Sequence, residues 1–575
     1  MIEATGSQII VKLLEQQGIT MAAGIPGGSV LPLYDELTRS NIKHILVRHE
    51  QAAGFIAQGI ARTTGLPAVC IATSGPGAMN LLTAIADARS DSIPMVAITG
   101  QVNSYLIGTD AFQEADTFGL SFPITKHSIM VKSPIELLEA IPHAFSIAAS
   151  GRPGPVLIDI PRDVQMAKCS FEKWPESGKL QKKATRFKTE GESFAKAITA
   201  FSNILAKANR PVLYAGGGCN SPEAAKGIFD FLEILPMPVV SSLMGIGCIP
   251  ESDYRWAGMV GMHGSATANR AMYDADVVLA AGVRFDDRAT GIVSKFCPNA
   301  TILHIDIDAA EVNKILPAEY SIIADCESVF PVLAEKIREE YKSGIQTKPW
   351  VEHIHKMYKE EQENIFKQNK NDSLPDPRSF IAKIPELAKK SGIQPEDIIV
   401  TTDVGQHQMW TAQFYPIEKP RQLLTSGSLG TMGFGLPAAI GAALANPQKR
   451  IVCFSGDGSI MMNIQELATL SEQNLDVTVI VLENGSLGMV RQQQEFLFDK
   501  NYSACLFEKQ PDLISIAKGF GIDAFDTVED SEWYKKAFPK NGCGPRFVRC
   551  RIAQAENVYP FVPAGKANIE AITGN

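Results

Sequence analysis

The segment RIVCFSGDGSIMMNIQELATLSEQNLDVTVIVLENG, residues 450–485, decides how this chain of 575 residues folds. It begins with an apolar run, continues with a stretch of helical periodicity at 459–474, and ends with a second apolar run. A strand, a crossover helix and a strand in this order predict a βαβ unit with parallel strands. The turns GDG (456–458) and ENG (483–485) follow the two strands, so we expect them at the same edge of the sheet.

Asp457 and Asn484 carry the polar oxygens of these two turns. A carboxylate, an amide oxygen, a backbone carbonyl and two phosphate oxygens suit the octahedral oxygen shell of Mg²⁺. The glycines beside Asp457 allow the backbone to approach a phosphate closely. A G-D-G turn followed at this distance by a strand-ending Asn is typical of a thiamine diphosphate site.

Glu50 is the candidate for the second protein group that thiamine diphosphate needs. A buried carboxylate on the aminopyrimidine nitrogen favours the imino tautomer that deprotonates the thiazolium carbon. Glu50 opens the helical stretch EQAAGFIAQGIAR, whose small residues permit close approach. The alternative is an ordinary helix N-terminal Glu favoured by the helix dipole. Because Glu50 is far from Asp457 in the chain, we expect the cofactor to bridge two domains, and in this kind of enzyme two subunits.

The same alternation of apolar runs and amphipathic stretches occurs along the whole chain. Runs typical of buried parallel strands occur at 67–73, 94–100, 154–161, 210–218, 276–283, 301–308, 397–405, 450–458 and 477–485. Polar segments at 167–195 and 341–378 are typical of linkers. We predict an α/β fold of three doubly wound parallel-sheet domains. Their expected bounds are 1–166 for pyrimidine binding, 190–340 for the central domain, and 375–575 for diphosphate and Mg²⁺ binding.

Composition excludes several classes of protein. The chain is 45% hydrophobic and 20% charged, as ordinary globular proteins are. Its net charge of −9, without a basic block, argues against a nucleic-acid partner. Glu3 stands where a signal peptide needs positive charge, and no apolar stretch reaches the length of a membrane span. The ten cysteines lack C-x-x-C spacing. We therefore expect a cytoplasmic protein with reduced thiols.

Motifs through almost the whole chain resemble the large catalytic subunit of acetohydroxyacid synthase (acetolactate synthase), a thiamine-diphosphate-dependent family. The resemblance rests on HEQAAGFIAQGIAR, TSGPGAMN, IGTDAFQEAD, GRPGPVLIDIPRDVQ, GMHGSATAN, GVRFDDRATG, VGQHQMW, GSLGTMGFGLPAAIGA and GDGSIMMNIQELATL. It implies that pyruvate is decarboxylated on the cofactor and that the two-carbon unit is joined to a second 2-ketoacid, pyruvate or 2-ketobutyrate. The product opens the synthesis of branched-chain amino acids.

The resemblance implies roles for individual residues at the thiamine site. Glu50 would activate the cofactor, Gly430 would offer its carbonyl to the aminopyrimidine, and Met432 would support the bent cofactor. Diphosphate and metal contacts would come from Gln406, His407, Gly456, Asp457, Asn484 and the carbonyl of Ser486.

The resemblance also implies a substrate pocket. Phe112 and Gln113 would line it near the thiazolium. Arg288 is the candidate for binding the acceptor carboxylate, since a guanidinium fork suits a carboxylate. Its alternative is a salt bridge to Asp286 or Asp287.

The middle third suggests a dinucleotide site on its own evidence. Gly216-Gly217-Gly218 ends one strand and Asp306-Ile307-Asp308 ends another. The pattern lacks the G-x-G-x-x-G form, so it does not identify the ligand. The resemblance makes the ligand FAD, with a structural role because the reaction involves no net redox change. Its expected contacts are Gly216, Met262, His263, Gly282, Arg284, Asp306 and Asp325.

The sequence departs from the common family pattern at three positions. Gln493, beside Met489 in the expected specificity pocket, replaces a Trp that favours 2-ketobutyrate through apolar contact with its extra methylene. Such a methylene is worth about 1–3 kcal/mol, so we expect weak preference and mainly acetolactate. Arg162 replaces a usual Lys, with no role assigned. Glu483 precedes Asn484 where Asn is frequent, with little expected effect.

Alternatives within the superfamily are glyoxylate carboligase, pyruvate oxidase and oxalyl-CoA decarboxylase. Glu50 argues against the first, and GTDAFQE and RFDDR argue against the others. A non-catalytic homologue would have lost Glu50, Asp457 or Asn484, and all three are present. The resemblance further implies a homodimer or tetramer, a separate small regulatory subunit, and a mobile active-site cover in the C-terminal segment 558–575.

Overall fold

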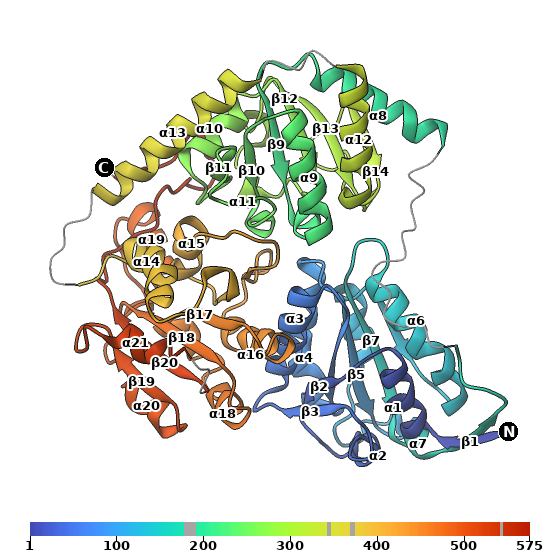
Figure 1. The fold of residues 1–575 in the computed structure, drawn as a ribbon. Helices are drawn as coiled ribbons and strands as arrows, with labels where there is room; N and C mark the ends of the chain where they lie inside the picture. Colours follow the sequence, from blue (N-terminus) through green and yellow to red (C-terminus); the bar gives the residue numbers. More distant parts are fainter. Residues whose placement is uncertain (177–190, 342–346, 368–373, 541–543, 575) are drawn as a thin grey trace.

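The computed structural model describes residues 1–575 except 177–190, 342–346, 368–373, 541–543 and 575. Within the described residues the strands form three six-stranded parallel sheets and one antiparallel pair. Helices accompany each sheet, and Figure 1 shows the resulting three units: N-terminal (blue), central (green) and C-terminal (orange to red). The predicted α/β fold with three parallel sheets is therefore confirmed.

The N-terminal sheet has the order β3-β2-β4-β5-β7-β6. Its strands are β3 (Lys43–Leu46), β2 (Met21–Gly24), β4 (Ala68–Ala72), β5 (Met95–Gln101), β7 (Pro155–Pro161) and β6 (His127–Met130). Its helices are α1 (Gly6–Gln16), α2 (Leu31–Leu37), α3 (Glu50–Thr64), α4 (Pro76–Ser90), α5 (Thr117–Ser121), α6 (Leu137–Ala149) and α7 (Arg162–Met166). The antiparallel pair of β1 (Ile2–Thr5) and β8 (Lys168–Phe171) closes this unit.

The central sheet has the order β11-β10-β9-β12-β13-β14, in which the strand sequence reverses between β9 and β12. Its strands are β11 (Trp256–Met259), β10 (Val239–Ser241), β9 (Pro211–Ala215), β12 (Val277–Ala281), β13 (Thr301–Asp306) and β14 (Tyr320–Ile323). Its helices are α8 (Glu192–Leu205), α9 (Pro222–Ile234), α10 (Ala266–Asp274), α11 (Asp287–Thr290), α12 (Cys326–Glu340) and α13 (Lys348–Lys367). This is the strand order of dinucleotide-binding folds.

The C-terminal sheet repeats the order of the N-terminal one, and its reversal lies between β15 and β17. Its strands are β16 (Leu423–Leu424), β15 (Ile398–Thr402), β17 (Arg450–Gly456), β18 (Val477–Glu483), β20 (Arg546–Arg551) and β19 (Asp523–Asp526). Its helices are α14 (Pro377–Lys390), α15 (Gln406–Phe414), α16 (Gly435–Ala445), α17 (Asp457–Ile460), α18 (Glu466–Glu472), α19 (Gly488–Leu497), α20 (Leu513–Gly519) and α21 (Trp533–Ala537).

Alternating side chains of the buried strands enter different hydrophobic cores. In β4, Val69 faces the core beneath α1 and α6, whereas Cys70 faces a core that continues into the C-terminal unit. Helices α3 and α16 cross within that shared core. A Cβ at Gly59 would lie 2.2 Å from the Ala438 oxygen, and one at Gly441 would lie 2.1 Å from the Ile56 oxygen. Glycine at both positions therefore allows the two units to pack in direct backbone contact.

Two expectations about local structure need correction. The stretch 459–474, expected to be one helix, contains the short α17 and the separate α18. The helix is interrupted where Asn463 turns its amide to the Gly433 oxygen, 2.7 Å away. Strand β8 lies inside the segment 167–195, which had been expected to be a linker. Parts of both expected linkers, at 177–190, 342–346 and 368–373, lie outside the described residues.

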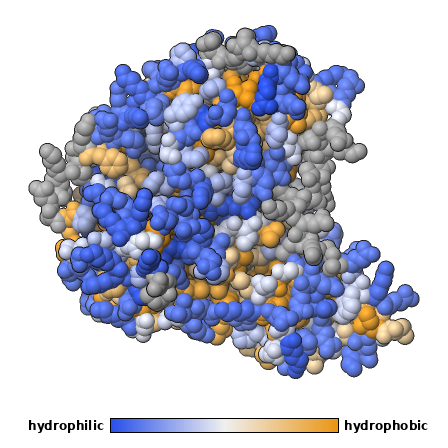
Figure 2. Space-filling model, viewed as in Figure 1, coloured by the Kyte–Doolittle hydropathy of each residue, from blue (hydrophilic) through white to orange (hydrophobic). Residues whose placement is uncertain are grey.

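The surface carries few large apolar areas in the view of Figure 2, where hydrophilic side chains predominate and hydrophobic ones form scattered patches. None of the helices in the described part of the chain is both long enough and apolar enough to cross a membrane. The nine cysteines that the structure describes are free thiols.

Candidate functional site

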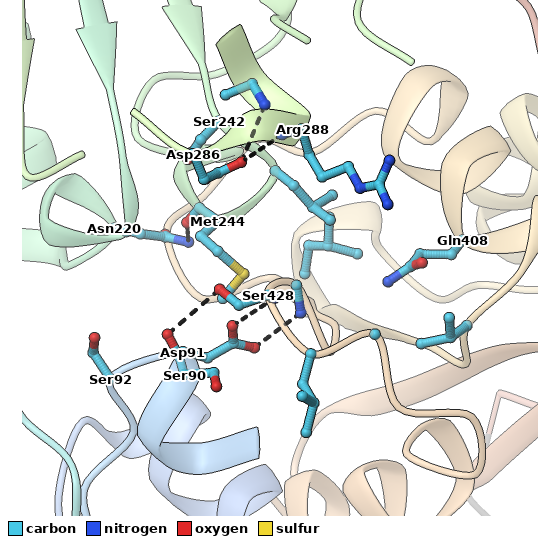
Figure 3. A pocket seen from close by; sticks show the side chains of 18 of the residues that line it. Ser90, Asp91, Ser92, Asn220, Ser242, Met244, Asp286, Arg288, Gln408 and Ser428 are labelled. Atoms are coloured by element: carbon cyan, nitrogen blue, oxygen red, sulfur yellow. Dashed lines mark hydrogen bonds between the residues drawn. The ribbon is translucent and has the colours of Figure 1, made fainter. Parts of the chain in front are cut away.

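A cavity of about 1030 Å³ lies where the three units meet. Figure 3 shows side chains from each unit around it, among them Asp91, Arg288 and Gln408. The cavity lies at the carboxyl ends of β9, β12, β15 and β17, where the strand order of two sheets reverses and where open α/β sheets bind ligands. Its lining includes these residues predicted from sequence: Met262, His263, Gly282, Arg284, Arg288, Asp306, Asp325, Gln406, His407, Gly430, Met432, Gly456, Asp457, Asn484, Ser486, Met489 and Gln493.

The two polar turns lie together, as the βαβ pattern predicts. The backbone N–H of Gly485 donates to Asp457 Oδ2 at 2.7 Å, which joins the end of β17 to the end of β18. Asn484 Nδ2 donates to Gln406 Oε1 at 3.2 Å. Burial raises the pKa of Asp457, so a cation beside it would stabilise its charged form. Gln510, which the sequence analysis missed, donates to Asp457 Oδ2 at 2.5 Å.

His407 lies behind the Gly456 turn as a neutral imidazole. Burial lowers the pKa of His407 to about 3. Its Nδ1 would lie 2.9 Å from a Cβ at Gly456, so glycine leaves room for the ring. Gln406 begins α15, whose first backbone N–H groups and positive dipole end face the cavity. Together these residues form a polar, close-packed cradle for an anionic group.

The loop 425–433 between β16 and α16 presents Gly430 and Met432 to the cavity. Gly430 adopts the left-handed region, with φ of +65°. Asp403, at the end of β15, accepts hydrogen bonds of 2.8 Å from the N–H groups of Val404 and Gly433. Sequence analysis missed this role of Asp403, although an acidic residue at a strand end in TTDVG is a recognisable signal.

Glycines bring the ends of β9 and β12 into contact on the central side of the cavity. A Cβ at Gly216 would lie 2.2 Å from the Gly282 oxygen, and one at Gly218 would lie 2.7 Å from Gly282 Cα. Gly216 packs behind the cavity, whereas Gly217 and Gly218 line it. Burial raises the pKa of Asp306, at the end of β13, to about 6. These features match a dinucleotide site at a strand reversal.

Arg288 projects from the start of α11 into open space. Its side chain is 69% exposed, and its contact with Asp287 is a long 3.8 Å. Asp286 instead caps α11 by accepting from the N–H groups of Arg288 and Ala289. The guanidinium therefore lacks a close carboxylate among the contacts of the described chain and is available to an anionic ligand.

Glu50, Phe112 and Gln113 do not line this cavity. They form a second group at the carboxyl edge of the N-terminal sheet. Asn80 Nδ2 donates to Glu50 Oε2 at 2.9 Å. A Cβ at Gly75 would lie 3.0 Å from Gln113 Cα, and one at Gly77 would lie 3.2 Å from Glu50 Oε1, so α4 begins between Glu50 and Gln113. Phe112 is 87% exposed. Within one chain, Glu50 therefore lies outside the cavity that Asp457 lines.

The C-terminal segment packs over the central side of the cavity. Val562 N–H donates to the Met262 oxygen at 2.9 Å, and the ring of Phe561 stacks on His263 with centroids 5.6 Å apart. Burial lowers the pKa of His263 to about 4. Gln493 and Met489 line the cavity from α19, one helical turn apart.

Three family models match the chain in succession. They describe a thiamine pyrophosphate enzyme N-terminal TPP binding domain at residues 4–120, a central domain at residues 198–333, and a C-terminal TPP binding domain at residues 403–550. Each match falls on one of the three parallel sheets.

Curated relatives match over nearly the full length. The acetolactate synthase isozyme 1 large subunit of Escherichia coli (strain K12) is 47% identical over 571 residues, covering 99% of this chain and 97% of the relative. The isozyme 2 large subunit of the same organism is 42% identical over 570 residues, covering 99% of both. The probable acetolactate synthase large subunit of Methanocaldococcus jannaschii is 42% identical, covering 97% and 94%. The chain thus belongs to the family of acetolactate synthase large subunits, within the thiamine-pyrophosphate enzymes.

Proposed function

We propose that the protein is the catalytic subunit of an acetolactate synthase that uses thiamine diphosphate, Mg²⁺ and a structural FAD. It decarboxylates pyruvate and condenses the two-carbon unit with a second pyruvate or, with weak preference, 2-ketobutyrate. The observation that carries the proposal is the cavity in which the Asp457–Asn484 turns, the Gly430 loop and Arg288 face one space. The reaction is the first common step toward valine, leucine and isoleucine.

The Asp457 and Asn484 turns fit a diphosphate–Mg²⁺ unit. Asp457 supplies a buried carboxylate oxygen, Asn484 supplies its amide oxygen, and Ser486 supplies a backbone carbonyl. Asn484 Oδ1 accepts from the Ser486 N–H at 3.1 Å, so this oxygen faces the turn that would hold the ion. Oxygen ligands of this kind are the ones that Mg²⁺ prefers. Gln406 and His407 would hold the diphosphate.

Glu50 would hold the proton at the aminopyrimidine nitrogen. When bound, thiamine diphosphate supplies a carbanion at its thiazolium ring that attacks ketoacid carbonyls. Asn80 orients the Glu50 carboxylate by its hydrogen bond, and Gly430 would accept a hydrogen bond at its carbonyl from the amino group. Met432 would support the bent cofactor from the same loop.

We infer that Glu50 and Asp457 belong to separate half-sites, because Glu50 lies outside the cavity that Asp457 lines, so that two copies of the chain would complete the site. The Glu50 edge also exposes an apolar side chain that a second copy would cover, because Phe112 is 87% exposed. We therefore propose a homodimer or a tetramer in which Phe112 and Gln113 of one copy line the substrate pocket of the other.

Arg288 would bind the carboxylate of the acceptor ketoacid, with Gln493 and Met489 shaping the pocket beside it. FAD would lie over the glycine contact at the ends of β9 and β12, beside Met262, His263, Arg284, Asp306 and Asp325. A side chain at Gly218 or Gly282 would collide with the opposite backbone, so glycine keeps the two strand ends close together beneath the proposed cofactor. The flavin would have a structural role, since the carboligation transfers no net electrons.

The family further supports a separate small regulatory subunit and a location in the cytoplasm. The segment 558–574 would act as a movable cover, since it lies across Met262 and His263.

An omission assay tests the proposal. The purified chain would be incubated with pyruvate, thiamine diphosphate, Mg²⁺ and FAD, and acetolactate measured after acid conversion to acetoin. We expect product only when all three cofactors are present, and a minor shift to acetohydroxybutyrate when 2-ketobutyrate is added. Oxygen-dependent peroxide without acetolactate would indicate an oxidase instead. Failure to form acetolactate, with a small subunit of a relative also supplied, would overturn the proposal.

A further inference from the structure

Residues 426–431 form a tight turn whose apex carries Gly430. Among the described residues, the hydrogen bonds that the rest of the C-terminal unit makes to this turn lie toward its two ends. Gln408 Nε2 donates to the Ser426 oxygen at 2.9 Å, and Asp403 accepts from the Gly433 N–H. Between these two contacts, the residues that line the cavity are Gly427, Ser428, Leu429, Gly430 and Met432.

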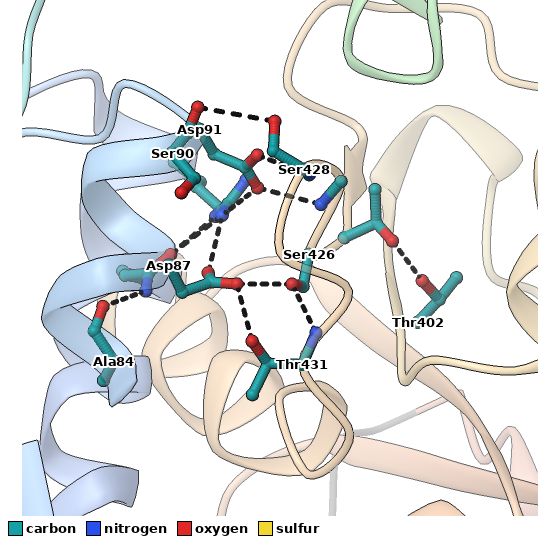
Figure 4. Close-up of polar contacts among 12 residues, drawn as sticks. Ala84, Asp87, Ser90, Asp91, Thr402, Ser426, Ser428 and Thr431 are labelled. Atoms are coloured by element: carbon teal, nitrogen blue, oxygen red, sulfur yellow. Dashed lines mark hydrogen bonds and ion pairs between the residues drawn. The ribbon is translucent and has the colours of Figure 1, made fainter. Parts of the chain in front are cut away.

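Asp87 of the N-terminal unit joins the two sides of the turn (Figure 4). Its Oδ1 accepts from the Ser426 hydroxyl and, at 3.0 Å, from the Thr431 hydroxyl. Ser426 Oγ in turn accepts from the Thr431 N–H at 2.8 Å. The Asp87 side chain is fully buried. A single carboxylate oxygen therefore fixes both ends of the segment that carries Gly430.

Asp91, the C-cap residue of α4, holds the middle of the same turn. Its two oxygens accept from the backbone N–H groups of Gly427 and Ser428 at 2.9 and 2.8 Å. Ser428 Oγ also accepts from Arg284 of the central unit. The contact of Asp91 with backbone groups sets the path of the main chain and not merely the rotamer of a side chain.

The buried charges of Arg62, Asp87 and Asp91, called the acid cluster below, favour the observed conformation of the turn 426–431. Arg62 is the guanidinium shared by both acids, at 3.4 Å from Asp87 and 2.9 Å from Asp91. Burial and the neighbouring Asp91 raise the pKa of Asp87. The donors of residues 426–431 compensate the remaining buried charge, and a loop that moved away would leave acceptors unsatisfied.

The N-terminal and C-terminal units do not depend on the acid cluster for their packing. The close packing of α3 on α16 at Gly59 and Gly441 already joins the N-terminal and C-terminal units. Asp87 instead contacts Ser426 and Thr431, which flank the cavity-lining residues 427–430, and Asp91 contacts Gly427 and Ser428 within them.

We propose that Asp87 and Asp91 are positioning residues of the N-terminal unit that hold the turn 426–431 so that the Gly430 carbonyl meets the aminopyrimidine of thiamine diphosphate. The inference rests on the proposed function for the role of Gly430. Helix α4 then serves two half-sites: Asn80 orients Glu50 near its start, and Asp87 and Asp91 set the Gly430 turn at its end.

The test compares Asp87→Asn and the milder Thr431→Val with a matched control, Asp159→Asn. Asp159 is also a fully buried acid of the N-terminal unit, but it is bonded to Thr99 and Gln101 within its own sheet. For each variant we would measure the affinity for thiamine diphosphate with Mg²⁺, the circular dichroism of the imino tautomer, the FAD content and the thermal midpoint.

We expect Asp87→Asn to weaken thiamine diphosphate binding by about tenfold and to diminish the imino signal, because a charged hydrogen-bond acceptor is lost. Thr431→Val should weaken binding about threefold by the same route, with FAD content preserved. Asp159→Asn should leave the affinity unchanged, whatever its effect on the thermal midpoint.

Unchanged affinity for thiamine diphosphate and an unchanged imino signal in both Asp87→Asn and Thr431→Val would overturn the inference while leaving the proposed function in place. An equal loss in Asp159→Asn would also overturn it, since the effect would then reflect general stability. A wild-type chain that fails to bind thiamine diphosphate would overturn the proposed function and the inference together.

Discussion

The side-chain amide of Gln492 forms two hydrogen bonds with the backbone of Val558. The Val558 N–H donates to Gln492 Oε1 at 2.7 Å, and Gln492 Nε2 donates to the Val558 oxygen at 3.1 Å. Gln406 Nε2 also donates to Gln492 Oε1 at 3.0 Å and to the Glu556 oxygen at 2.8 Å. The residue proposed to hold the diphosphate is thus joined to the chain that leads into the C-terminal cover.

Gln492→Leu should release this cover. Each lost hydrogen bond is worth about 0.5–1.5 kcal/mol, so we expect cleavage by protease within 556–562 to accelerate about tenfold. The Michaelis constant for thiamine diphosphate should rise, because Gln406 loses a partner. Gln494→Leu is the control on the same helix, since Gln494 bonds to Ser503 instead. Equal cleavage rates in the two variants would contradict the expectation.

Glu50→Gln should abolish most of the activity without unfolding the chain. The amide keeps the size of the carboxylate but cannot hold the proton, and general acid–base groups contribute about 10²- to 10⁴-fold. We expect an acetolactate rate lower by a factor in that range at saturating cofactor. Glu36→Gln, in helix α2 of the same unit, where Glu36 pairs with Arg39, should retain wild-type activity. If the acetolactate rate of Glu50→Gln were within twofold of the wild-type rate, Glu50 would not be a catalytic residue.

Gln493→Trp should shift the product ratio toward acetohydroxybutyrate. Gln493 lines the cavity from α19, and an indole there would give the extra methylene of 2-ketobutyrate an apolar contact. One methylene is worth about 10- to 200-fold in discrimination, so we expect an increase of about tenfold. The ratio would be measured with both ketoacids competing. Gln493→Leu distinguishes apolarity from size: a shift as large as that of Trp would show that apolarity alone suffices.

The sheets could be predicted from sequence because buried parallel strands are nearly continuous apolar runs. The expected runs at 276–283 and 477–485 contain β12 and β18, for example. Strands such as β16, with two residues, are too short to give a periodic signal.

The polar turns at strand ends were predictable for the same reason, since a sheet brings its carboxyl ends together. Contacts between the units could not be predicted from the sequence. Asp87 and Ser426 are 339 positions apart, and a buried acid inside a helix looks in sequence like any surface acid. Glu50 could be recognised as a candidate from the sequence, and the fold adds that it lies outside the cavity lined by Asp457 of its own chain.

His407 should make the cofactor-free chain less stable in acid. Its pKa is lowered to about 3 by burial, whereas an unfolded histidine has a pKa of about 6.5. Below pH 6.5 the unfolded chain binds a proton that the folded chain does not, so the stability present above pH 6.5 is lost progressively toward pH 3. At pH 5 the loss amounts to about 2 kcal/mol. His407→Gln should therefore show a smaller fall in thermal midpoint between pH 8 and pH 5 than the wild type. The control is His127→Gln, at an exposed position on β6, whose thermal midpoint should fall by as much as that of the wild type. If the thermal midpoint of His407→Gln also fell by as much as that of the wild type, His407 would be protonated in the folded chain.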